Sequence, residues 1–288
     1  MEGTLRGLIS AFGTVLAFIR PTIPGSSPAW LRDLFPVIAW IFFSDEATVH
    51  VDQHDEGEIS ETFLYVNGIC TTRRMALATG AELGHMLNKK VGVVHNPTDS
   101  VLIDLFECLL EKLWPGRSWA TSAPTTLLVE QLMAALKNPS KTKVVLIAHS
   151  QGTIIASDAL VHLWGAVDKG ELPKASFGKA RYRQADKILE LYNLANAGHR
   201  MHQRDGFPYI ESICNHRDPV GMLGANAPAR AKALWKIDIA GKVVYPTKPR
   251  WGHLISSHYL KHLKNNDYPD TKLHTYMEAG LPETATTG

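Results

Sequence analysis

Residues 143–161 read KVVLIAHSQGTIIASDALV and combine two hydrophobic patterns within nineteen residues. The apolar run Val144–Ile147 is typical of a buried strand, and apolar residues at three- and four-residue intervals from Ile154 onward are typical of a helix. Ser150 lies at the junction between the two patterns. A serine at the apex of a sharp strand-to-helix turn forms a nucleophile elbow, which exposes the hydroxyl beside the free N–H groups of the helix N-terminus. The segment therefore predicts a nucleophilic serine.

The local context distinguishes Ser150 from a second match to the pattern Ser-x-Gly. That match, Ser176-Phe177-Gly178, follows the polar Lys174 and has no strand pattern before it. Ala148 stands where the usual motif has glycine, a departure of one methyl group that the close strand–helix contact must accommodate. Ser150 is accordingly the candidate nucleophile.

In these residues the chain resembles the alpha/beta-hydrolase superfamily. The resemblance implies an α/β fold with a mostly parallel central sheet flanked by helices. It also implies three landmarks in a fixed order: an oxyanion-hole turn before the serine, an acid after a later strand, and a histidine near the C-terminus. Alternating strand-like and helix-like patterns between residues 61 and 263 agree with this expectation.

The expected oxyanion turn follows the strand-like run Thr62–Val66, which ends in Asn67-Gly68. By the resemblance, the backbone amides of Ile69 and Gln151 would hold a negatively charged oxygen, and Gly68 would permit the turn. An ordinary Asn-Gly turn would have the same local sequence.

The expected acid is Asp218, which follows the strand-like run Tyr209–Asn215 and precedes Pro219. A carboxylate at the C-terminal end of a strand can reach the second ring nitrogen of a histidine, and a proline stiffens the loop. Asp205 lies before this strand and Glu211 lies within it. Asp218 is therefore preferred to these two rivals.

The expected general base is His253, which lies between a strand or hairpin at Trp235–Tyr245 and a helix at Leu254–Leu263. A base that swings between acid and nucleophile is better placed in a loop than inside a helix. His258, one helical turn later, remains the alternative base. The chain order Ser150, Asp218, His253 agrees with the superfamily.

Composition limits the other classes of function. The 288 residues carry a net charge of +2 with dispersed basic residues, so no nucleic-acid partner is expected. Three widely spaced cysteines, Cys70, Cys108 and Cys214, favour reduced thiols and a cytoplasmic location. The thirteen histidines include the close pair His50 and His54 but no complete set of ligand spacings, so we expect neither a metal nor another cofactor.

Residues 1–45 are expected to form an N-terminal helical extension to a hydrolase domain at residues 46–288. The extension contains two apolar blocks, Leu5–Ile19 and Leu31–Phe43, and the first is too short to span a bilayer comfortably. We interpret these blocks as a lid over the substrate, a homodimer contact or a peripheral membrane contact.

The predicted activity is that of a serine hydrolase. It would cleave a carboxylic ester, lactone or thioester of an apolar small molecule through an acyl-enzyme. Trp114 and Trp119, in a loop with glycine and proline, suit an apolar acyl substrate. Two alternatives stay open: the same triad used for acyl transfer, cyclisation or C–C cleavage, and a catalytically silent binding protein on this fold.

Overall fold

The computed structural model describes residues 48–50, 60–69, 71–97, 122–172, 189–198, 200–204 and 208–280. All of them lie within one compact unit, Ser44–Gly288. The predictions for residues 1–45, for Cys70, Cys108 and Asp205, and for the loop with Trp114 and Trp119 fall outside these described residues.

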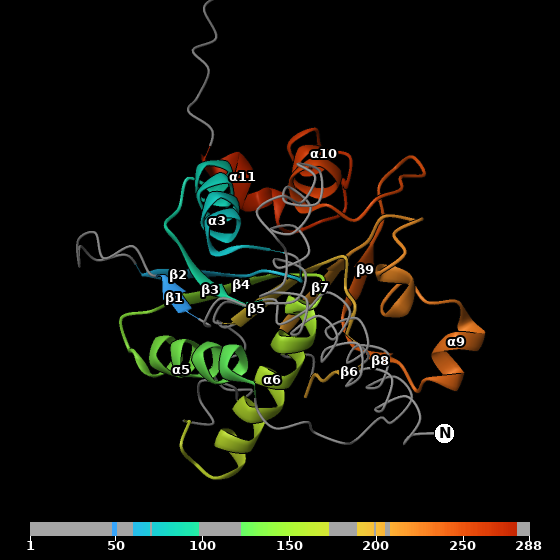
Figure 1. The fold of residues 1–288 in the computed structure, drawn as a ribbon. Helices are drawn as coiled ribbons and strands as arrows, with labels where there is room; N and C mark the ends of the chain where they lie inside the picture. Colours follow the sequence, from blue (N-terminus) through green and yellow to red (C-terminus); the bar gives the residue numbers. More distant parts are fainter. Residues whose placement is uncertain are drawn as a thin grey trace, which may run out of the picture. The chain divides into compact units, whose positions relative to one another are not determined.

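The described part of the chain is built on a seven-stranded sheet with the order β1-β3-β2-β4-β5-β7-β9 (Figure 1). β1 pairs antiparallel with β3, and every other neighbouring pair is parallel. The strands are β1 (Thr48–His50), β2 (Glu61–Val66), β3 (Val91–His95), β4 (Lys143–His149), β5 (Leu189–Leu194), β7 (Tyr209–Ile213) and β9 (Lys242–Val244). The predicted mostly parallel sheet is confirmed.

Helices cover both faces of the sheet (Figure 1). One face carries α3 (Arg73–Leu87), α10 (Lys261–Lys264) and α11 (His274–Gly280), and the other carries α5 (Ala123–Lys137) and α6 (Gly152–Asp168). This layered arrangement, with the sharp turn from β4 into α6, is the alpha/beta-hydrolase fold predicted from the sequence.

The central strand β4 is apolar from Val144 to Ala148 because helices cover both of its sides. Val144, Leu146 and Ala148 pack in the cluster with α5 and α6, whereas Val145 and Ile147 pack in the cluster with α3 and the C-terminal helices. All five side chains are fully or almost fully buried. The continuous apolar run in the sequence therefore reflects a strand that is buried on two faces.

The segment Trp235–Tyr245 differs from the predicted single strand or hairpin. It contains two short strands that belong to different sheets: β8 (Asp238–Ile239) pairs in parallel with β6 (Arg200–Met201), and β9 pairs with β7. Gly241 separates them with φ +93°, and a Cβ there would lie 2.2 Å from the carbonyl oxygen of Ile210. This close approach leaves no room for a side chain at Gly241, and β8 and β9 pair with β6 and β7 instead of with each other.

Three short helices complete the C-terminal half. They are η1 (Gly221–Leu223), α9 (Ala229–Leu234) and η2 (Ile255–Leu260), the last of which is a π-helix that continues directly into α10. The helix predicted at Leu254–Leu263 is thus present, but its first part is more widely wound than an α-helix. No helix among the described residues is long and apolar enough to cross a membrane.

Candidate active site

Ser150 lies at the turn between β4 and α6 and has a backbone φ of +56°. Few residues other than glycine adopt this left-handed conformation, which costs about 1–3 kcal/mol and persists only where the surroundings enforce it. The Ser150 amide donates to the carbonyl of Leu194, and the Thr153 hydroxyl donates to the Ser150 carbonyl at 2.6 Å. Hydrogen bonds at both its amide and its carbonyl therefore hold the strained backbone of Ser150.

Two glycines allow other backbone segments to approach the serine closely. A Cβ on Gly152 would lie 2.6 Å from the carbonyl oxygen of Val66, and a Cβ on Gly68 would lie 2.5 Å from the Ser150 Cβ and 3.0 Å from its Oγ. Neither contact tolerates a side chain. Gly68 therefore leaves free the space beside the Ser150 hydroxyl.

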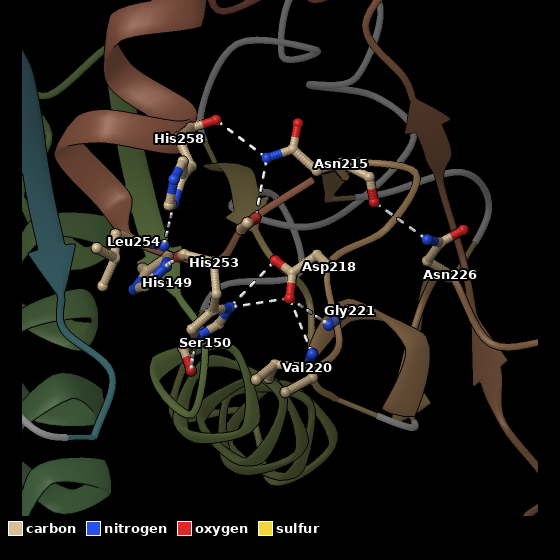
Figure 2. A network of polar contacts seen from close by, with 12 residues as sticks. His149, Ser150, Asn215, Asp218, Val220, Gly221, Asn226, His253, Leu254 and His258 are labelled. Carbon is tan, nitrogen blue, oxygen red and sulfur yellow. Dashed lines mark hydrogen bonds and ion pairs between the residues drawn. The ribbon is translucent and has the colours of Figure 1, made fainter. Parts of the chain in front are cut away.

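Ser150, His253 and Asp218 form a continuous series of hydrogen bonds (Figure 2). The His253 Nε2 lies 2.8 Å from the Ser150 Oγ, and its Nδ1 lies 3.0 and 3.1 Å from the two carboxylate oxygens of Asp218. In this arrangement Nδ1–H donates to the carboxylate, which leaves Nε2 free to accept the serine proton. These are the three residues that the sequence predicts as nucleophile, base and acid.

Asp218 is completely buried, and each of its oxygens accepts hydrogen bonds. The amides of Val220 and Gly221 donate to Oδ1 at 2.8 and 3.1 Å, and the Tyr259 hydroxyl donates to Oδ2 at 2.6 Å. Burial opposes ionisation, but the hydrogen bonds and the positive potential of His253 outweigh it and lower the pKa of Asp218 below its ordinary value. A buried anion therefore faces the His253 ring near neutral pH.

The predicted oxyanion turn is fixed by an asparagine pair at the ends of β2 and β3. The Asn67 side chain donates to the Asn96 carbonyl at 2.7 Å and accepts from the Asn96 amide at 2.9 Å, which continues the contact between these strands beyond their last residues. The Asn96 side chain also donates to Gln151 Oε1 at 2.7 Å. Asn96 therefore connects the turn that carries Ile69 to the residue after Ser150.

The backbone amides of Ile69 and Gln151 are the predicted oxyanion donors. No group in the described part of the chain accepts a hydrogen bond from either amide. Gln151 is the N-cap residue of α6, and no side chain caps this helix. The amides of Thr153 and Ile154 donate to the carbonyls of Ser150 and Gln151, so it is the Gln151 amide that remains available beside the serine.

The alternative base His258 has a different environment. Its Nδ1 accepts from the amide of Leu254 at 3.0 Å, and its ring lies 5.4 Å from that of Trp251. A Cβ on Gly252, where φ is +104°, would lie 2.5 Å from His258 Nδ1. The His258 ring thus contacts the backbone on both sides of His253, and its hydrogen bond goes to the Leu254 amide rather than to Ser150 or Asp218. The rival acid Glu211 lies inside β7 and is bonded to Tyr209 and Thr271.

Sequence reasoning did not identify three further residues near the site. The His149 ring lies 4.8 Å from the His253 ring, Tyr259 binds the acid, and Asn215 Nδ2 donates to the carbonyls of Gly252 and His258, each at 3.0 Å. The sequence did offer a local signal for His149, because this residue directly precedes Ser150. Tyr259 and Asn215 have no such signal, because only the folded chain brings them to Asp218 and the His253 loop.

A metal site is not formed by the residues that the structure describes, which include no group of three or more histidine, cysteine or acidic side chains able to hold an ion. The pair His50 and His54 falls largely outside this part of the chain.

No protein-family model and no curated protein matches the chain. Among solved structures it is similar to a proposed hydrolase of the alpha/beta superfamily from Xanthomonas campestris pv. campestris, with 13% identity over 76% of this chain and 96% of that chain and a TM-score of 0.37. A serine hydrolase without lid from Xanthomonas campestris has 15% sequence identity over 83% of this chain and 90% of that chain, with a TM-score of 0.40. Est1E from Butyrivibrio proteoclasticus has 13% sequence identity over 81% of this chain and 90% of that chain, with a TM-score of 0.34. Identities and TM-scores are low, so the fold assignment depends on the strand order and elbow of the chain itself.

Proposed function

We propose that this protein is a serine hydrolase and that Ser150, His253 and Asp218 are its catalytic triad. The observation that carries the proposal is the unbroken series of hydrogen bonds from the Ser150 hydroxyl through both His253 nitrogens to a buried carboxylate. The strained backbone of the serine supports it, since unfavourable conformations of this kind cluster at functional sites.

In the proposed reaction, the Ser150 Oγ attacks a carbonyl carbon while His253 Nε2 accepts the hydroxyl proton. Asp218 keeps the ring in the correct tautomer and stabilises the imidazolium that forms. The amides of Ile69 and Gln151 stabilise the oxyanion, a contribution worth about 10²–10³ in kcat for one such donor. His253 then protonates the leaving group, and an activated water releases the acyl group from the serine.

The proposed substrate is a carboxylic ester, lactone or thioester with an apolar acyl part. Two large apolar side chains support this choice, because Trp251 and Leu254 flank His253 in the chain and are 71% and 64% exposed. Apolar side chains that remain in water beside a reactive group are suited to bind an apolar substrate.

Labelling with a fluorophosphonate tests the proposal. The wild-type protein should react at Ser150, identified by peptide mapping, and Ser150→Ala should stay unlabelled while its thermal unfolding is nearly unchanged. A folded wild-type protein that does not react would instead indicate a silent binding protein on a hydrolase fold.

Product analysis in ¹⁸O-labelled water distinguishes hydrolysis from the other uses of the triad. Hydrolysis of a p-nitrophenyl ester incorporates one labelled oxygen into the released acid. Product without the label, formed when an alcohol or amine acceptor is added, would identify acyl transfer.

A further inference from the structure

The loop that carries His253 is anchored at three consecutive residues by three side chains: one at the end of β4, one in the loop after β7 and one in η2. Asn215 Nδ2 donates to the carbonyl of Gly252, His149 Nε2 lies 2.8 Å from the carbonyl oxygen of His253, and the amide of Leu254 donates to His258 Nδ1 (Figure 2). A loop would ordinarily be among the more mobile parts of a domain. Here each residue from 252 to 254 has one backbone group bound by a side chain.

Of these three side chains, His149 alone is joined directly to the nucleophile, because it is the residue before Ser150 at the end of β4. Its ring is 7% exposed and packs at 4.8 Å and an interplanar angle of 31° against the ring of His253. The partner of Nε2 is a carbonyl oxygen, which can only accept, so His149 carries its proton on Nε2. Burial, together with the positive potential of His253, lowers the pKa of His149 to about 3, so the ring is neutral at working pH.

These contacts form a closed path of covalent bonds and hydrogen bonds that contains both Ser150 and His253. One path runs from the Ser150 backbone through the His149 side chain to the His253 carbonyl, and the other runs from the His253 Nε2 to the Ser150 Oγ. The first path restrains the distance between the two backbones while the second transfers the proton. A shift of the base by about 1 Å can cost roughly 100-fold in rate, so such a restraint has a direct kinetic value.

We propose that His149 is a positioning residue, whose Nε2–H holds the main chain of His253 in register with Ser150. The inference rests on the proposed function of Ser150 and His253, because it assigns His149 a role in their proton transfer. The ring nitrogen Nε2 of His149 bonds to the main chain of His253 and not to the Ser150 hydroxyl.

The test compares three substitutions at His149 that separate the effect of the aromatic ring from the effect of its Nε2–H donor. His149→Phe keeps an aromatic ring of similar size but has no N–H group. His149→Gln places an amide N–H near the position of Nε2, and His149→Asn offers the same group about one methylene short of the carbonyl. The rate constant for fluorophosphonate labelling of Ser150 and the kcat for a p-nitrophenyl ester are measured for each.

We expect the Phe and Asn variants to lose about 30- to 100-fold in both rates with KM changed less than about threefold, and the Gln variant to recover to within about tenfold of the wild type. Wild-type rates in the Phe variant, or equal losses in the Gln and Asn variants, would overturn the proposal. If the Phe variant does not fold, the comparison of the Gln variant with the Asn variant still tests the proposal.

His274 supplies a matched control. It is also a buried histidine whose Nε2 bonds to a backbone carbonyl, that of Leu263 at 2.9 Å, and it lies at the start of α11. His274→Phe should lower the unfolding temperature but keep kcat within about twofold. If it loses activity as strongly as His149→Phe, the effect is one of general packing and the positioning role is wrong.

A spectroscopic measurement tests the contact independently of activity. Nitrogen-15 NMR of the imidazole groups should show His149 as the neutral Nε2–H tautomer from neutral pH down to about pH 5, with a slowly exchanging proton. The Nδ1–H tautomer or a protonated ring would refute the contact. If this signature is present and the wild-type protein fails to react with the fluorophosphonate, the hydrolase proposal fails while the hydrogen bond stands.

Discussion

The neutral state of buried His149 makes the protein less stable in mild acid by an amount that can be calculated. In the unfolded chain the ring has an ordinary pKa of about 6.5 and takes up a proton as the pH falls. In the folded protein burial lowers this pKa to about 3, so the ring stays neutral. The unfolded state therefore binds more protons than the folded state between these two values, and the free energy of unfolding declines as the pH falls from about 6.5 toward 3.

The size of this effect at pH 5 follows from the difference between the unfolded pKa and the pH. Each unit is worth about 1.4 kcal/mol, and pH 5 lies about 1.5 units below the unfolded pKa, so the wild-type protein loses about 2 kcal/mol relative to pH 7.5 through this one ring. The result depends little on the folded pKa as long as it stays below about 4. Asp218 contributes little over the same interval, because its lowered pKa matters only below the ordinary range of a carboxyl group.

The assay is urea denaturation of the wild-type protein and of His149→Gln at pH 7.5 and pH 5. The glutamine cannot titrate, so the variant should lose about 2 kcal/mol less than the wild type over this interval, even if it is the less stable protein at pH 7.5. Comparing the two declines cancels the shared histidines that lie away from residue 149. A difference below about 0.5 kcal/mol would refute the reasoning, since it would mean that His149 takes up a proton in the folded state as readily as in the unfolded chain.

Three other predictions concern the site and its cover. His253→Ala should lower kcat at least about 100-fold more than His258→Ala, which removes only the ring contact to the Leu254 amide; the reverse ranking would make His258 the base. Gly68→Ala should lower both the labelling rate and the unfolding free energy, the latter by about 1–3 kcal/mol, because its Cβ would lie 2.5 Å from that of Ser150; stability and rates equal to those of the wild type would contradict the close approach. The lid interpretation of the N-terminal apolar blocks, made from the sequence, predicts that removal of residues 1–43 reduces turnover of long-chain esters more than of short ones, whereas an equal reduction for both would indicate simple destabilisation.

The elbow and the layered fold could be predicted from the sequence because their determinants are local. The buried strand, the turn at Ser150 and the helix that follows lie within about twenty consecutive residues, and each leaves its own hydrophobic period. The strand β7 was also expected, within the run Tyr209–Asn215, although the buried polar residues Glu211 and Ser212 interrupt its apolar pattern. The prediction of a strand or hairpin at Trp235–Tyr245 was wrong in its pairing, because the two short strands of this segment pair with β6 and β7, whose positions the local sequence does not record.

The relation of the two histidines, in contrast, was decided by the tertiary structure. His253 and His258 are one helical turn apart, and no local pattern states which ring lies 2.8 Å from the Ser150 Oγ. That distance depends on the positive φ of Gly252 and on the bonds of the loop backbone to Asn215, His149 and His258. These partners are up to 104 residues away in the chain. A sequence pattern records which residues are buried along one element, whereas hydrogen bonds between distant elements leave no period, so only the folded chain reveals them.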